Sequence, residues 1–137
     1  MNIVLALLLA FSAPLFLLFV EAVLPYPFVI EELVKLLAVI LLVREEQEKN
    51  RSFCIFILLV GALFTISESV FYLVNIFTEG DLSLFPKRLL ITGMLHIGTT
   101  FLIYLFGRRN KYLLVIGFLL AVLIHYYFNL WVGDFTR

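Results

Sequence analysis

Five long apolar runs, separated by short polar or turn-forming segments, most constrain what this chain can fold into. A helix that crosses a bilayer needs roughly 20 apolar residues, so each run is close to the length of one membrane span. We therefore predict an all-α protein, a polytopic transmembrane helical bundle of about five membrane-spanning helices. The predicted spans cover residues 3–24, 28–43, 53–77, 89–106 and 112–132.

The composition agrees with a lipid environment. Hydrophobic residues make up 64% of the 137 residues and charged residues 15%, whereas a soluble domain has about 45–50% apolar and about 25% charged residues. No polar stretch is long enough to fold separately, so residues 1–137 are predicted to form a single transmembrane domain surrounded by membrane lipids. The net charge of zero gives no footprint for nucleic acid. The single cysteine, Cys54, cannot form an intramolecular disulfide and is interpreted as a packing residue.

The distribution of basic residues predicts an orientation. With five spans, the polar loops 44–52 and 107–111 lie on the same side as the N-terminus and contain six Lys and Arg residues, against three on the opposite side. Basic residues favour the cytoplasmic side, so the N-terminus is predicted to be inside. The first run has no basic residue before it and is expected to be a retained helix, not a signal peptide. A compact chain of this kind suits an integral protein of a prokaryotic plasma membrane.

Several ionisable residues lie inside the predicted spans, where a charge costs roughly 2.5–3.5 kcal/mol at the bilayer centre. At a rise of about 1.5 Å per residue, Glu68, His96 and His125 each lie about 10–12 Å from the predicted outer end of their helices. Glu31 and Glu32 lie about 5 Å inside the outer end of theirs. Random placement would scatter such residues over both halves of the membrane, so their common level predicts that they meet.

The spacing within each run adds to this prediction. Glu31, Glu32 and Lys35 are three and four residues apart and share one helix face, where Lys35 can neutralise one carboxylate. One carboxylate can then stay ionised while its neighbour holds a proton, as general acid–base chemistry requires. His125 and Asn129 are four residues apart and can face the same cavity. The predicted catalytic residues are Glu31, Glu32, Glu68, His96, His125 and Asn129, with Lys35 tuning the charge of the glutamates.

Four motifs in order, each inside its own apolar run, make the chain resemble a known family. They are EExxK at 31–35, FxxxE at 64–68, an isolated His96 and HxxxN at 125–129. This order is similar to that of the PrsW family of intramembrane proteases, a relative of the type II CAAX prenyl proteases and the bacteriocin-processing Abi proteins. The resemblance covers about residues 28–132. It implies a glutamate-dependent or metal-dependent peptidase that cuts a single-span membrane protein, such as an anti-sigma factor, on the extracytoplasmic side.

Two chemistries are open for these residues. Glu68, His96 and His125 would form a catalytic Zn²⁺ site with three protein ligands, with Glu31 or Glu32 as the general base. No HExxH motif is present to diagnose zinc. In the metal-free alternative a glutamate activates water, and the histidines and Asn129 stabilise the oxyanion. The charge partner that EExxK places beside its glutamates favours the metal-free alternative slightly.

A different class of function uses the same residues. Intramembrane glutamates and histidines also form relays in proton- or cation-coupled transporters and channels. Such a path needs polar residues across the full thickness of the membrane. Residues 112–124, the inner half of the last predicted span, contain no Asp, Glu, Lys, Arg or His, which counts against a path through the membrane. A catalytically inactive relative that binds membrane proteins is a third reading. The intact EExxK motif and both histidines favour the intramembrane endopeptidase over these alternatives.

Overall fold

The computed structural model describes residues 2–21, 23–49, 52–79 and 82–135, and within these ranges it contains five α-helices and no strand. The helices are, in chain order, α1 (Asn2–Glu21), α2 (Pro27–Lys49), α3 (Cys54–Glu79), α4 (Leu84–Gly107) and α5 (Lys111–Phe135). The predicted all-α class and the predicted number of helices are confirmed.

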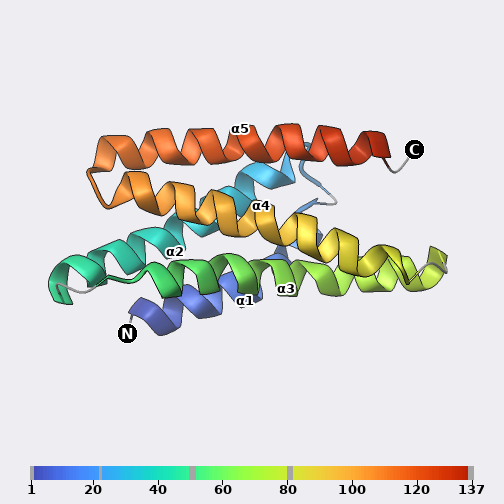
Figure 1. The fold of residues 1–137 in the computed structure, drawn as a ribbon, viewed down its shortest axis with the longest axis horizontal. Helices are drawn as coiled ribbons and strands as arrows, with labels where there is room; N and C mark the ends of the chain where they lie inside the picture. The colour runs from blue at the N-terminus through green and yellow to red at the C-terminus, as the bar shows by residue number, and fades with distance from the viewer. Residues whose placement is uncertain (1, 22, 50–51, 80–81, 136–137) are drawn as a thin grey trace.

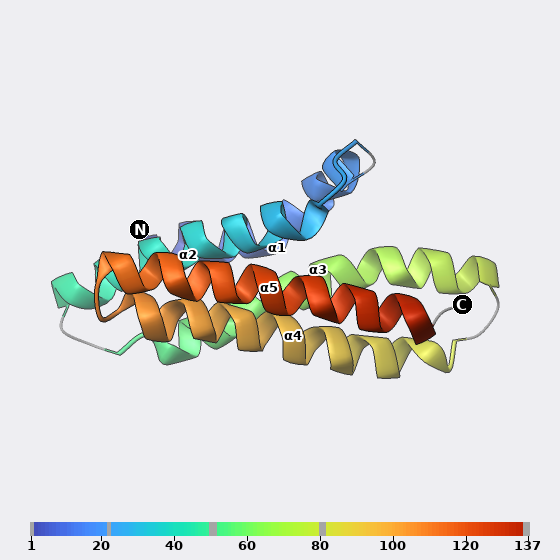
Figure 2. The ribbon, with the colours of Figure 1, turned by 90° about the horizontal axis from the view of Figure 1, so that it is seen from above.

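The helices run side by side along the long axis of the molecule (Figure 1). The start of α1 and the α4–α5 turn lie at one end, and α5 ends at the other. α4 packs between α3 and α5, while α2 contacts each of the other four helices. From above, the end of α1 and residues 23–26 stand away from α3, α4 and α5 (Figure 2). The helix with the most buried charge, α2, is therefore the one that contacts every other described helix.

Two helix boundaries differ from the prediction. α2 continues to Lys49, into the segment predicted as an aqueous loop from residue 44. Its last turns are rich in strong helix formers, and Glu45 forms an ion pair with Lys49 four residues later. α4 begins at Leu84, five residues before the predicted start of the fourth span at residue 89. The third residue of α4 is Pro86, and proline is tolerated in the first turn, where its missing N–H has no helical partner.

Small and branched apolar side chains fill the half of the bundle nearer the start of α1. Ala6 and Ala10 of α1 are at most 1% exposed and let α1 approach its neighbours closely. We call six of the other fully buried side chains of this cluster the apolar layer. It consists of Ala38, Val39, Leu42, Ile57, Val60 and Ile103.

Gly61 brings the backbones of α3 and α4 into contact. A Cβ atom at this position would lie 2.6 Å from the Cα atom of Ile97 and 3.0 Å from the carbonyl oxygen of His96. Both neighbours are backbone atoms of α4, which no side-chain rotation can move. The spacing of these two helices at the level of His96 therefore depends on glycine.

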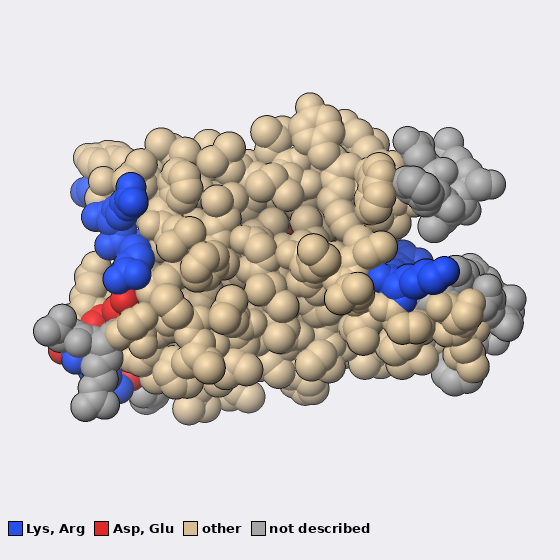
Figure 3. All heavy atoms as spheres, in the orientation of Figure 1, with Lys and Arg blue, Asp and Glu red and all other residues tan. Residues whose placement is uncertain are grey.

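The outer surface fits a membrane environment. α4 over Phe85–Gly107 and α5 over Lys111–Val132 are long and apolar enough to cross a bilayer, and Asn2–Leu17 and Cys54–Val70 are shorter apolar stretches. In the view of Figure 3, Lys and Arg side chains gather at the two ends, and the surface between them carries no visible band of charge. Spanning by the other three helices, and the orientation of the bundle, stay predictions.

Candidate active site

The structure brings the predicted site residues together, with one exception. α2 contributes Glu31, Glu32 and Lys35, α4 contributes His96 and α5 contributes His125. Their residues are between 0% and 7% exposed. α3 adds Glu68, whose side chain is 18% exposed. Because burying an uncompensated charge is costly, these groups must compensate one another.

Glu32 is the centre of this cluster. Its Oε1 atom lies 2.6 Å from Lys35 Nζ, 3.3 Å from Thr99 Oγ1 and 2.8 Å from His125 Nδ1. Lys35 Nζ also donates to Thr99 Oγ1 at 3.3 Å and lies 4.9 Å from the ring centroid of Phe64, a cation–π contact. One carboxylate oxygen thus joins side chains of α2, α4 and α5, and the ammonium beside it is fully partnered.

The two imidazoles are each held by a carboxylate on one nitrogen. Nδ1 of His125 pairs with Glu32, and Nε2 of His96 pairs with Glu68. The ring centroids of the two histidines are 5.5 Å apart. Within the described residues, Nδ1 of His96 has no hydrogen-bond partner although it is buried. Metal-ligating histidines characteristically give their second nitrogen to a carboxylate in this way, which fixes the tautomer and the ring orientation.

A third carboxylate, that of Glu31, lies beside the two imidazoles. Glu31, His96 and His125 each offer one ligand atom, and these atoms all lie within 4.8 Å of one another. Nε2 of His125 lies 3.7 Å from Oε2 of Glu31. Two imidazoles and one carboxylate form a usual ligand set of catalytic Zn²⁺ sites. The residues present therefore fit a divalent metal ion.

This arrangement changes the ligand set predicted from the sequence. The prediction combined the two histidines with Glu68, but the structure groups them with Glu31. Glu68 lies against Nε2 of His96. The buried nitrogen of His96 that has no hydrogen-bond partner is the other one, Nδ1. Its position is that of a carboxylate that orients a ligand.

Asn129 is the predicted site residue that the structure does not bring to the cluster. Its side chain is exposed, and within the described ranges no hydrogen bond links it to Glu31, Glu32 or the histidines. The buried stripe of α5 passes from Ala121 to His125 and then to the half-buried Phe128, whose ring centroid is 6.5 Å from that of His125. Each step of four residues exceeds the helical turn of 3.6 residues, and two successive steps lead from Ala121 to Asn129, so Asn129 lies further round the helix and outside the stripe.

Thr99 is the site residue that motif spacing misses. It lies three residues after His96, on the same face of α4, and it bridges Lys35 and Glu32. The spacing from His96 is the signal that could have identified it.

A second polar cluster lies beyond the apolar layer, near the start of α3. The hydroxyl of Tyr104 donates to Oε1 of Glu46 at 3.1 Å and lies 3.5 Å from Sγ of Cys54. Arg108 is 3.4 Å from the same Glu46 oxygen. Cys54 therefore has polar partners, where the sequence predicted only packing.

Comparison with protein families gives one result. A family model described as PrsW family intramembrane metalloprotease matches residues 2–137. The match therefore also includes the first helix, which lies before the segment of about residues 28–132 that resembles the family by its motifs. Searches among curated proteins and among solved structures give no match.

Proposed function

Because the chain belongs to the PrsW family of intramembrane metalloproteases, we propose that it hydrolyses peptide bonds of membrane-protein substrates at a metal ion held by Glu31, His96 and His125. The family makes the chain a protease, while these ligands and their roles are our proposal. The observation that carries it is the pair of buried imidazoles, each held by a carboxylate on one nitrogen, grouped with the carboxylate of Glu31.

The other glutamates have separate roles in this proposal. A divalent ion such as Zn²⁺ would supply Lewis-acid polarisation of the peptide carbonyl. Glu68 orients His96, and Oε1 of Glu32 orients His125. Within the described residues, Oε2 of Glu32 is buried without a hydrogen-bond partner, so it is the oxygen that accepts a proton from the attacking water. Lys35 Nζ, 2.6 Å from Oε1 of Glu32, places a positive charge beside that carboxylate.

The location of the site supports a position of cleavage. Glu31 and Glu32 lie in the first turns of α2, and His125 lies in the second half of α5. Both positions lie on the side of the apolar layer toward the end of the bundle where α5 finishes, and the start of α2 lies near the middle of the long axis (Figure 1). With the N-terminus inside, this end faces outward, and the enzyme cuts near the outer membrane face. By family resemblance the substrate is a single-span membrane protein of the anti-sigma-factor kind, and the membrane is a prokaryotic plasma membrane.

The apolar layer disfavours the transporter alternative. It lies between the Glu32 cluster and the Glu46 cluster, and its six side chains are 0% exposed. A proton relay across the bundle would need polar groups at this level. Hydrolysis needs no such path across the bundle.

The test combines metal content with cleavage. The full chain is purified in mild detergent and incubated with a panel of single-span membrane proteins, before and after chelation and Zn²⁺ reloading. We expect Glu31→Gln and His125→Ala to lose both metal and cleavage. Glu32→Gln also weakens the hold on His125 and should lower the metal affinity by about 10–100-fold. At a Zn²⁺ concentration that saturates the site, this variant should still lose activity by about 10²–10⁴-fold, the usual contribution of a general base.

Asn129→Ala is the matched control, one turn from His125 on the same helix. Because Asn129 is exposed, this variant should cleave like the wild type. Cleavage that survives His125→Ala, or that chelation leaves unchanged, would refute the proposed metal site.

A further inference from the structure

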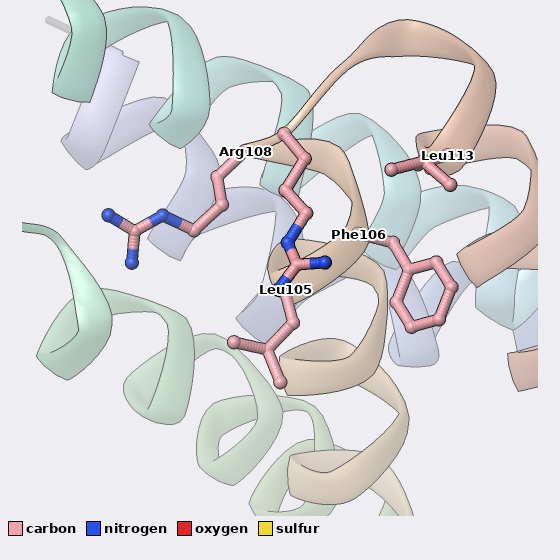
Figure 4. A pocket seen from close by; sticks show the side chains of 5 residues that line it. Leu105, Phe106, Arg108 and Leu113 are labelled. Carbon is pink, nitrogen blue, oxygen red and sulfur yellow. The ribbon is translucent and has the colours of Figure 1, made fainter.

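A cavity of about 420 Å³ lies at the opposite end of the bundle from the site, at the turn between α4 and α5. Its lining combines two kinds of side chain. In Figure 4 the apolar side chains of Leu105, Phe106 and Leu113 are drawn with that of Arg108, which extends away from them. The apolar residues Leu105, Phe106 and Leu113 provide one part, and the guanidinium groups of Arg108 and Arg109 provide the other. A ligand that fits this lining is apolar at one end and anionic at the other.

The turn that forms the cavity is held in place by its own contacts. Asn110 caps α5, because its Oδ1 atom accepts from the backbone N–H of Tyr112 at 3.0 Å and of Leu113 at 2.8 Å. A Cβ atom on Gly117 would lie 2.9 Å from Cβ of Phe106, so α4 and α5 are in close contact there. A preformed cavity lowers the entropic cost of binding.

The two arginines are placed differently. Arg108 lies 3.4 Å from Glu46 and 5.4 Å from the ring centroid of Tyr104, and these contacts fix its direction. Arg109 is exposed and forms no ion pair with any described residue. The cavity therefore keeps an uncompensated positive charge, and a guanidinium binds phosphate oxygens in pairs.

The position of the cavity identifies the ligand class. It lies where the apolar surface of α4 and α5 gives way to the charged end of the bundle (Figure 3), which is the level of lipid headgroups. Basic pockets between membrane helices bind anionic headgroups. We propose that this cavity binds an anionic phospholipid, with the phosphate on Arg108 and Arg109 and the start of an acyl chain on Leu105, Phe106 and Leu113.

The experiment is native mass spectrometry of the full chain in detergent, titrated with dioleoyl phosphatidylglycerol or with dioleoyl phosphatidylcholine. We expect phosphatidylglycerol to bind more tightly. Arg109→Gln should weaken its binding by about fivefold, the effect of one cation near an anionic lipid surface. Arg109→Lys, which keeps the charge, should restore part of the affinity. Lys111→Gln is the matched control, since it removes an exposed charge of the same turn that does not line the cavity, and it should bind like the wild type.

Three results would overturn the proposal. Equal binding of the two lipids would mean that the headgroup charge is not recognised. Equal losses in Arg109→Gln and Lys111→Gln would mean that the lipid responds to diffuse charge. Displacement of phosphatidylglycerol by an equal concentration of inorganic phosphate would identify a free anion as the ligand.

Discussion

Replacing Gly61 with alanine should separate α3 from α4 at the active site. The new Cβ atom would lie 2.6 Å from Cα of Ile97, whereas ordinary contacts begin at 3.4 Å. The two helix backbones must therefore move apart by about 0.8 Å, the difference between 3.4 and 2.6 Å. A displacement of about 1 Å at a catalytic group is enough to lower the reaction rate. Because the contact is with backbone, the helices themselves must move apart. The shift falls where Glu68 of α3 holds His96 of α4.

The expected cost follows from two opposing effects. Overpacking a tight interface costs roughly 1–3 kcal/mol, while alanine gains about 0.5–1 kcal/mol over glycine within a helix. We expect the free energy of unfolding to fall by about 1–2 kcal/mol. Activity should fall further, since a misplacement of about 1 Å at a catalytic group can cost about 10²-fold. Thus Gly61→Ala should lose more activity than its loss of stability explains.

The assay compares Gly61→Ala with Gly98→Ala. A Cβ atom on Gly98 meets nothing within 4 Å, so Gly98→Ala should unfold no earlier than the wild type and should cleave normally. Unfolding is followed in detergent by circular dichroism, and cleavage is measured on the substrate found with the wild type, at a temperature where both variants are folded.

Wild-type stability and cleavage in Gly61→Ala would refute the reasoning. It would mean that α3 and α4 can separate at this level without cost. Equal defects in both glycine variants would point to helix propensity or lipid contact, and would also contradict the steric argument.

Three further predictions concern other contacts. Lys35→Met leaves the buried carboxylate of Glu32 without its charge partner and should destabilise the fold by about 3–5 kcal/mol in denaturant titrations; unchanged stability would show that the ion pair contributes nothing. Glu68→Gln should weaken Zn²⁺ binding by about 10–100-fold in competition with a chromophoric chelator, because in the proposed site Glu68 orients His96 without binding the metal ion itself. Complete loss of the metal would instead make Glu68 a ligand. Asn110→Ala removes the cap of α5 and should cost about 1 kcal/mol, seen as faster hydrogen exchange at Tyr112 and Leu113 and not at the opposite end of α5.

The helices and the meeting of the charged residues could be predicted because each has a strong physical cause. Apolar runs of this length have few structures open to them in lipid. Ionisable side chains such as Glu32 and His125 are tolerated inside a bundle only when they satisfy one another. Their common level along separate helices was therefore enough to predict contact, and Glu32 and His125 do form a hydrogen bond.

The exact grouping could not be predicted, because it depends on helix rotation and side-chain direction. By depth Glu68 matches the two histidines better than Glu31 does, yet the structure groups Glu31 with them, because depth along a helix does not give the direction of a side chain around it. Asn129 shares a spacing with His125 but not a face, since burial on α5 shifts to Phe128. The contact at Gly61 has no local signal at all, because the partner atoms are more than thirty residues away in sequence.

The links made by Glu32 also bear on how the chain is assembled in a membrane. α2 carries two carboxylates and an ammonium, yet one of the groups that satisfies Glu32 lies 67 residues further along the chain and another lies 93 residues further. During synthesis α2 therefore emerges before any of its partners on α4 and α5. Its polar face must stay in water, or with the insertion machinery, until the last helix is made. Truncation before α5 should leave the first two helices exposed to quality-control proteolysis, so completion of the active site and stable insertion are one event.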